Sequence, residues 1–310
     1  MAYKKPLPRF VPVIALLLLA VTAGPSKTRA NGQRLETFVS IPPQSYLVER
    51  IGGDRVHVTV LVEPGASPHT FEPTPRQVAS LMSADLYFGI GLPFEARVLK
   101  KVGSRNAAFS IIHTEQGIIR RPLDIPRGRT QEAYHPDAHD GHQGSEGSPD
   151  PHLWLSIPEI RIQSINIYEA LADREPAYRD RYKINLDRLL DDLDRVDATL
   201  AGIFESYRGR PFFVYHPSFG YFADRYGLVQ VPIEIEGKRP TPKQIERLIR
   251  EAKAQGAHVI FVSPQFDSKS ADIIAEAIGG AVVPIDPLAK DVLQNLESIA
   301  VKIRQALKPQ

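Results

Sequence analysis

The sequence predicts an α/β protein made of two βα lobes with parallel sheets, joined by one long spanning helix. Two stretches of alternating strand and helix patterns, residues 31–174 and 206–310, predict the N-terminal and C-terminal lobes. A single apolar stripe at helical spacing within residues 175–205 predicts the linking helix. The chain has 310 residues, which is enough for two domains that each have a core.

In the first lobe, short apolar runs alternate with helical segments. Strands are expected at 36–41, 56–62, 86–90 and 107–112, and helices at 44–51 and 75–84. The β-branched run at 56–62 is typical of a buried strand. Strands that alternate with helices pair in parallel, so their carboxyl ends meet at one edge of the sheet, where ligands bind.

The second lobe repeats this rhythm. Strands are expected at 211–215, 258–262 and 281–285, and helices at 242–254, 271–278 and 287–307. The sequence PTPRQ at 73–77 returns as PTPKQ at 240–244. In each, Thr is the expected N-cap, Pro the first helical residue and Gln the partner in a capping box. Duplication of one lobe and independent use of the same helix-start chemistry both explain the repeat.

The segment between the lobes predicts one continuous helix from 176 to 204, roughly 40 Å long at 1.5 Å per residue. Its apolar side chains follow spacings of three and four, and charged residues occupy much of the opposite face. A coiled coil is the alternative, but fewer than four clean heptads favour a rigid helix that joins two lobes. The stripe consists of Tyr178, Tyr182, Leu186, Leu189, Leu193, Val196, Leu200 and Ile203.

The composition excludes several classes of protein. There is no cysteine, so thiolate metal sites, thiol catalysis and disulfides are all excluded, and a transition-metal site has to use histidine and carboxylate. The net charge of +2 comes from 38 basic and 36 acidic residues, which does not indicate a nucleic-acid surface. We expect no nucleic-acid partner, and we expect a monomer.

Residues 1–30 have the pattern of a cleaved signal peptide. A basic start with Lys4, Lys5 and Arg9 precedes an apolar run over 10–20, and small residues follow. The run is short for a membrane span, and without cysteine no lipoprotein anchor is possible. The sequence therefore predicts an exported, periplasmic protein. A polar, unpatterned stretch at 132–150 predicts a mobile loop that contains His135, His139 and His142.

Four residues are candidate metal ligands because of their positions. His216 and Asp286 directly follow predicted strands, His69 lies in the loop after the 56–62 strand, and His152 lies where the chain leaves the polar loop. Three imidazoles and one carboxylate would make a four-ligand site suited to zinc. Each could instead be an ordinary loop residue. His57, His113 and His258 lie within or at the ends of strands, where structural roles are favoured.

At these residues the chain resembles a known family, the periplasmic metal-binding proteins of ABC importers with a rigid helical linker. The motifs that carry the resemblance are PGASPHTFEPTP at 64–75, DPHLW at 150–154, YHPSFGYFADRYGL at 215–228 and IDPLA at 285–289, and a further match runs from PTPKQ at 240 to HVIFVSPQF ending at 266. The resemblance covers nearly the whole mature chain. It implies that His69, His152 and His216 bind the metal with Asp286 as the acidic fourth ligand, and that the partner is a membrane permease.

The resemblance also bears on the metal. Manganese-binding relatives typically carry a carboxylate where this chain has His216, and a third imidazole favours Zn²⁺ over harder ions. Within the family, manganese or iron binding is the alternative. His135, His139 and His142 could form a weak second metal site or lie in a solvated linker. Two further classes, a periplasmic zinc hydrolase and a surface adhesin, are less favoured because the chain has no HExxH helix and no adhesive repeat. We expect no enzyme activity.

Overall fold

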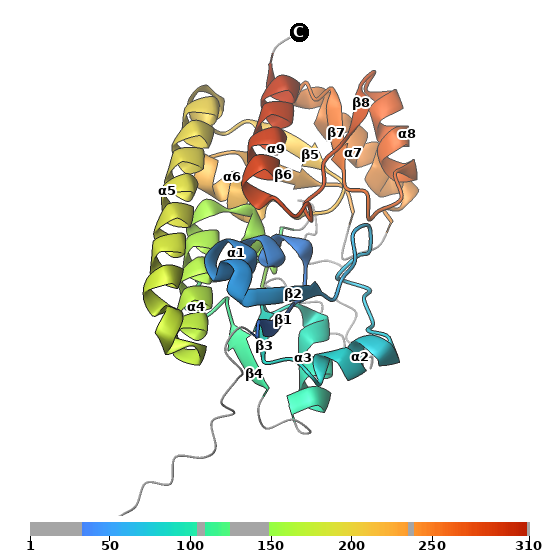
Figure 1. Cartoon of the computed structure of the whole chain (residues 1–310). Coiled ribbons are helices and arrows are strands. Elements are labelled where there is room, and N and C mark those ends of the chain that lie inside the picture. Colours follow the sequence, from blue (N-terminus) through green and yellow to red (C-terminus); the bar gives the residue numbers. More distant parts are fainter. Residues whose placement is uncertain (1–32, 104–108, 125–148, 235–238, 309–310) are drawn as a thin grey trace, which may run out of the picture. The chain divides into compact units, whose positions relative to one another are not determined.

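The computed structural model describes residues 33–103, 109–124, 149–234 and 239–308. These residues form two four-stranded sheets in which every pair of neighbouring strands is parallel (Figure 1). The strand orders are β2-β1-β3-β4 and β6-β5-β7-β8, so the two sheets have the same topology. The predicted α/β class with two parallel sheets is confirmed.

The first sheet and its helices follow the predicted order. β1 and β2 pair in register from Leu35 opposite Val56 to Val39 opposite Val60. The amide of Leu61 continues the ladder by donating to the carbonyl of Val39. The elements of this lobe are β1 (Leu35–Val39), α1 (Pro42–Gly52), β2 (Val56–Val60), α2 (Pro75–Leu81), β3 (Leu86–Gly89), α3 (Pro93–Gly103), β4 (Ser110–His113) and α4 (Ile157–Arg174).

The second sheet is buried on both faces along its central strand. Phe212 and Val214 belong to the larger apolar core, whereas Phe213 and Tyr215 belong to a second core with residues of α7 and α8. This is the pattern of a parallel strand covered by helices on both sides. The elements are β5 (Pro211–Val214), α6 (Gly220–Tyr226), β6 (Val229–Pro232), α7 (Pro242–Ala254), β7 (Val259–Val262), α8 (Lys269–Ala277), β8 (Ala281–Pro284) and α9 (Val292–Leu307).

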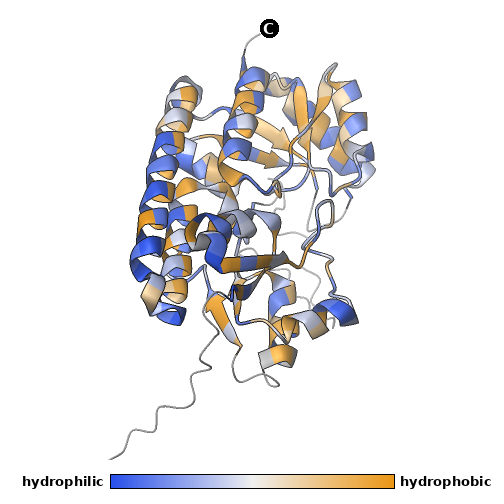
Figure 2. Ribbon diagram, in the orientation of Figure 1, coloured by the Kyte–Doolittle hydropathy of each residue, from blue (hydrophilic) through white to orange (hydrophobic). Residues whose placement is uncertain are grey.

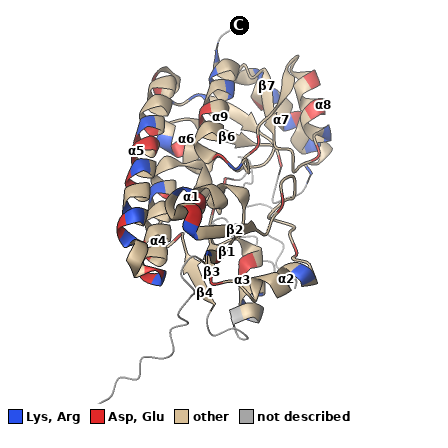
Figure 3. Cartoon of the chain, viewed as in Figure 1, with Lys and Arg blue, Asp and Glu red and all other residues tan. Residues whose placement is uncertain are grey.

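A 26-residue helix, α5 (Arg179–Phe204), follows a short 3₁₀ turn at Pro176–Tyr178. It packs against α1 and α4, which accompany the first sheet, and against α6 and α9, which accompany the second. Its buried side chains lie at helical spacing, and its polar residues alternate with them in the hydropathy view (Figure 2). Acidic and basic residues recur along its outer face (Figure 3). The stripe that the sequence predicts is thus the packing face, and the larger core runs along it.

Several boundaries differ from those predicted. The closing helix begins at Val292 rather than at 287, because Asp291 caps it by accepting from the amide of Gln294. Helix α7 occupies the predicted residues 242–254, and α2 ends at Leu81 rather than at 84. Both carry the predicted capping box, in which the Gln77 and Gln244 side chains accept from the amides of Thr74 and Thr241. Both capping boxes lie between the second and third strands of their lobes, so the repeated motif has the same place in the topology of each lobe.

Two predicted segments lie wholly outside the described residues or nearly so. The signal peptide at 1–30 is outside them, and of the 132–150 loop only residues 149 and 150 are described. Within the described residues, no helix is both long enough and apolar enough to cross a membrane.

Candidate metal centre

Three loops bring His69, His152 and His216 together. His69 lies in the loop between β2 and α2, His216 lies two residues after the end of β5, and His152 directly precedes a 3₁₀ turn at Leu153–Leu155. Each has a proline as neighbour: Pro68, Pro151 and Pro217. Proline has no amide hydrogen and a fixed φ, so it cannot extend a strand ladder, and the chain turns at these points.

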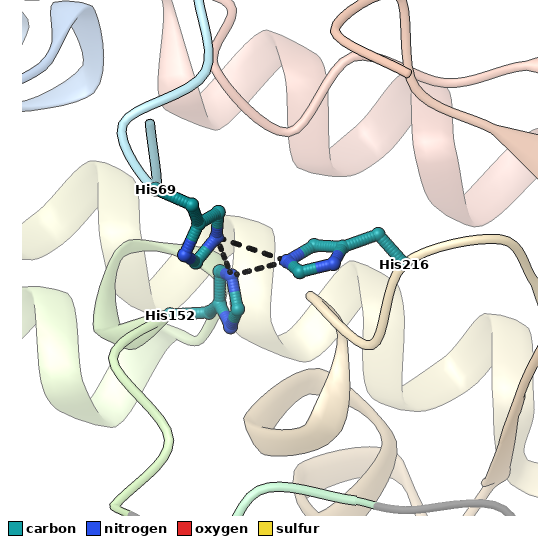
Figure 4. A group of neighbouring side chains, drawn as sticks. All are labelled: His69, His152 and His216. Atoms are coloured by element: carbon teal, nitrogen blue, oxygen red, sulfur yellow. Dashed lines mark hydrogen bonds between the residues drawn. The ribbon is translucent and has the colours of Figure 1, made fainter. Parts of the chain in front are cut away.

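The Nε2 atoms of the three imidazoles converge (Figure 4). They are 3.0 Å apart between His216 and His69, 3.2 Å between His216 and His152, and 3.4 Å between His152 and His69. Zinc binds imidazole nitrogen at about 2.0–2.1 Å, and tetrahedral geometry then places two such nitrogens about 3.3 Å apart. The spacing therefore suits one small metal ion that contacts all three nitrogens.

A carboxylate lies behind each of the two buried histidines. His216 Nδ1 is 2.6 Å from Glu234 Oε1, and His152 Nδ1 is 2.7 Å from Asp150 Oδ1. A carboxylate oxygen can only accept, so in each ring Nδ1 carries the proton and Nε2 presents a lone pair to the centre. Histidines that bind metal typically have such a hydrogen-bond partner at the ring nitrogen that does not bind the metal.

Asp150 is itself held in place. Its Oδ1 accepts from the amide of His152 at 3.0 Å, and its Oδ2 accepts from the Arg121 guanidinium at 3.0 Å. Burial raises the pKa of Asp150, but the hydrogen bonds from His152 and Arg121 outweigh this and hold the pKa below its usual value. Arg121 also bonds Asp224 of α6 at 2.7 Å, so it joins the His152 segment to the second lobe.

The surroundings keep the imidazoles neutral. Burial lowers the pKa of His216, against the opposing hydrogen bond with Glu234. Burial and the neighbouring rings of His216 and His152 lower the pKa of His69 to about 2. His69 is exposed as a residue, but its ring faces the other two, as Figure 4 shows. A neutral imidazole is the form that binds metal, so no proton has to leave these two rings near neutral pH.

The cavity beside the three rings is small and mostly apolar. The cavity volume is about 10 Å³, which can hold about one water-sized molecule and is too small for an organic ligand. Phe266 stacks on His216 with 4.6 Å between ring centroids. Trp154 donates from Nε1 to the carbonyl of Pro287 at 2.7 Å, which ties the His152 segment to the loop after β8.

Asp286, the predicted fourth ligand, lies outside the group of three histidines, whose ligand atoms are all within 4.8 Å of one another. Asp286 Oδ1 accepts from Gln265 Nε2 and from the amide of Leu288, each at 2.9 Å. Gln265 and Leu288 line the cavity. Asp286 therefore contacts two residues that line the cavity rather than lining it itself.

The remaining candidate residues separate into two groups. His135, His139 and His142 lie outside the described residues. His57 and His113 lie on the first sheet, where their Nδ1 atoms are 2.7 Å from Glu36 and 3.1 Å from Glu115. Both are exposed and neither belongs to the three-histidine group.

Sequence reasoning does not single out Glu234 or Arg121. Glu234 follows β6 in the run VQVPIEI, and an acidic residue between two isoleucines is a signal that could identify it. Asp150 appears in the DPHLW motif without an assigned role. Arg121 has no such signal, because Asp150 and Asp224, the partners that connect it to the site and to α6, are remote from it in the sequence.

Residues 38–306 match the family described as zinc-uptake complex component A, periplasmic (ZnuA). A crystal structure of a ZnuA deletion mutant with zinc bound is 40% identical with a TM-score of 0.79, and the match covers 90% of this chain and 100% of that one. The high-affinity zinc uptake system protein ZnuA of Bacillus subtilis is 29% identical over 300 residues, 93% of this chain and 88% of that one. The manganese ABC transporter substrate-binding lipoprotein PsaA of Streptococcus mitis is 24% identical over 274 residues, 86% and 84% of the two chains.

Two parallel α/β lobes, a long helix packed on both and three convergent imidazoles define a class, the metal-binding substrate-binding proteins of ABC transporters. The chain belongs to the ZnuA family within it.

Proposed function

We propose that this protein captures zinc in the periplasm and delivers it to the permease of an ABC importer, with His69, His152 and His216 as metal ligands and an oxygen as the fourth. One observation carries the proposal. His216 and His152 direct two hydrogen-bond acceptors at each other across 3.2 Å. The lone pairs of these two nitrogens repel each other. A proton on His69 Nε2 does not lie between them and cannot remove this repulsion, whereas a cation bound to all three nitrogens does.

The choice of zinc rests on the ligand set. Three neutral imidazoles suit zinc, whereas manganese prefers carboxylate, carbonyl and water oxygens. The 40% identical ZnuA structure has zinc bound, which supports the same assignment. Manganese is the alternative, because a manganese-binding lipoprotein is among the relatives.

The remaining parts of the proposal concern location and partners. The basic and apolar start of the chain supports export with cleavage of the signal peptide after Ala30 or after Ala23. Relatives named as parts of uptake systems support the permease as partner. We propose a monomer. We also propose that the metal centre has no enzyme activity, which is supported by its cavity of about 10 Å³, too small for an organic substrate.

We also propose that residues 31–174 and 206–310 move as lobes about a rigid linking helix at 175–205. The packing of α5 against helices that accompany both sheets supports a limited closure on metal binding.

Metal analysis of protein purified from the periplasm tests the proposal. We expect one zinc per chain, and in competition at neutral pH we expect zinc to exclude manganese and iron. Equal or preferred retention of manganese would contradict the zinc assignment. Detection of the intact Met1 on cytoplasmic protein would contradict export, and turnover of ester or peptide substrates by the zinc-loaded protein would contradict the absence of enzyme activity.

A further inference from the structure

The Arg121 guanidinium connects the carboxylate behind His152 to the second lobe. Its Nη1 atom donates to Asp150 Oδ2 at 3.0 Å, and Asp150 Oδ1 is 2.7 Å from His152 Nδ1. Its Nε atom donates to Asp224 Oδ2 of α6 at 2.7 Å, and its Nη2 atom donates to Asp124 Oδ1 at 2.8 Å. All three guanidinium nitrogens therefore donate to carboxylates, which fixes the position and the plane of the group.

The backbone beside this ion pair is joined as well. The Asp150 amide donates to the Arg121 carbonyl at 2.9 Å, and the Tyr221 hydroxyl donates to the Asp150 carbonyl at 3.1 Å. The Arg121 amide donates to the same hydroxyl at 3.2 Å. Tyr221 belongs to α6, which also packs against the 3₁₀ turn that follows His152. Helix α6 thus contacts both residues of the Arg121–Asp150 pair.

A glycine at the start of α6 makes room for the guanidinium. Gly220 does not have a positive φ, so its backbone conformation does not require glycine. A Cβ atom at this position would overlap Arg121 Nη1 and would approach Asp150 Oδ2 to 2.8 Å. Because glycine is less favourable than alanine in a helix, the close approach of Arg121 is the physical reason for glycine here.

We infer that Arg121 is a positioning residue for the metal centre: it holds Asp150 where this carboxylate accepts from His152, and it makes the position of His152 depend on α6. This inference rests on the proposed function, in which His152 binds the metal. The Asp150 side chain is 0% exposed, so loss of the guanidinium leaves a buried charge without its cationic partner. Displacement of the carboxylate behind a ligand histidine typically weakens metal binding about 10- to 100-fold.

The connection reaches the protein surface. The Asp224 side chain is 64% exposed, whereas that of Arg121 is 16% exposed. Asp224 does not line the cavity beside the three histidines, yet a change of its charge acts on Arg121 and through it on Asp150. Since ion pairs of exposed groups are weak, this effect is smaller than that of losing Arg121 itself.

The experiment compares four variants with a matched control. Arg121→Gln removes the charge, Arg121→Lys keeps it, Gly220→Ala displaces the guanidinium, and Asp224→Asn removes the charge on α6. Arg225→Gln is the control, because Arg225 lies on the same helix but donates from Nε to Asp197 Oδ1 of α5 at 3.0 Å. Zinc affinity is measured by competition with a chromophoric chelator, and circular dichroism checks the fold. If Arg121→Gln does not fold, Gly220→Ala tests the same contact.

We expect Arg121→Gln to weaken zinc binding about tenfold, Arg121→Lys and Asp224→Asn about threefold, and Arg225→Gln less than about twofold. Gly220→Ala alone should cost about tenfold. Added to Arg121→Gln, it should cost less than about twofold more, because both changes act through the same side chain. Additive losses from these two changes would overturn the inference. An Asp224→Asn affinity equal to that of the control would overturn the link to α6.

The ring nitrogens separate positioning from a general loosening of the protein. In zinc-loaded protein with ¹⁵N-labelled histidine, Glu234→Gln identifies the Nδ1 signal of His216, and Asp150→Asn identifies that of His152. We expect Arg121→Gln to shift the His152 signal and to leave the His216 signal in place, and Arg121→Lys to shift the former less. An unshifted His152 signal, or equal shifts of both signals, would overturn the inference. Failure of the wild-type protein to bind zinc would instead overturn the proposed function, and the His152 signal of the metal-free protein would then still test the role of Arg121.

Discussion

The two lobes share a strand order, yet they supply the metal centre in different ways. In the second lobe, the first strand, β5, leads into His216, and Glu234 after β6 lies behind that ring. In the first lobe, β1 leads into Ser40, whose hydroxyl bonds to Tyr87 at 2.5 Å and to buried Glu95. The loop after the second strand of that lobe, β2, carries His69. The topology thus fixes where the carboxyl ends of strands meet, and the side chains decide which ends form the site.

The three histidines of the metal centre also differ in their exposure and in their hydrogen-bond partners. His216 and His152 are 7% and 2% exposed, and each has a carboxylate at Nδ1. His69 is exposed, and Ser67 Oγ accepts from its backbone amide at 3.3 Å. Two anchored rings therefore present their nitrogens in fixed positions, and the exposed ring completes the set. The following predictions test this contrast.

Removal of an anchored ligand should have the largest effect. We expect His216→Ala to weaken zinc binding by more than about 100-fold, since a ligand is lost and Glu234 remains buried without its partner. His69→Ala should reduce zinc affinity by a factor about ten times smaller than His216→Ala does, because water can enter at the exposed position. Competition titration with circular dichroism as a fold control measures both. Equal losses in the two variants would remove the distinction between anchored and exposed ligands.

Replacement of a carboxylate behind a ligand should have an intermediate effect. Glu234→Gln keeps an oxygen that can accept from His216 Nδ1 but removes the charge, so zinc affinity should fall about tenfold. Glu246→Gln, on the exposed face of α7, is the matched control and should change nothing. If both variants bind zinc like wild type, the carboxylate does not tune the ligand.

The stability of the metal-free protein should fall as the pH falls below about 6.5. The pKa values of His216 and His69 are lowered in the folded protein, so the unfolded chain takes up protons that the folded chain does not. The stability is present above the unfolded pKa and is lost progressively below it. We expect a smaller loss between about pH 7.5 and 5 for His216→Gln than for wild type in chelator-treated denaturant titrations. An identical loss would show that His216 titrates normally.

Deletion of residues 133–147 should have the smallest effect on the principal site. His135, His139 and His142 are predicted to contribute at most a weak second binding event. Calorimetric titration of the deletion variant should therefore keep the tight event and lose only the weak one. Loss of the tight event would mean that these histidines belong to the principal site.

The sequence predicts most of the fold because its signals are local. Helix α7 begins where Thr241 and Pro242 start it, and β5 and β8 have the predicted first residues. Sequence reasoning assigns no helix to α4, whose run IRIQSINI places isoleucines at both helical and alternating spacings. Packing of α4 against α1 and α5 supports the helix there, and such contacts are not visible in a local pattern.

The site is predictable in part for the same reason. His216 follows a strand that the sequence identifies, and its role as a ligand candidate follows from that position. Glu234 contacts His216 and Gln265 contacts Asp286 across 18 and 21 residues of sequence, so no spacing signal identifies these contacts. Asp286 follows its strand as expected, but the tertiary structure engages one of its oxygens with Gln265 and Leu288.

X-ray absorption at the zinc edge of the loaded protein tests the central claim most directly. Three convergent Nε2 atoms predict a four-coordinate zinc with three imidazole nitrogens at about 2.0–2.1 Å and one oxygen. The His216→Ala protein, loaded at high zinc, should lose one imidazole from this set. A six-coordinate oxygen-rich shell, or a wild-type spectrum with fewer than three imidazoles, would contradict the account.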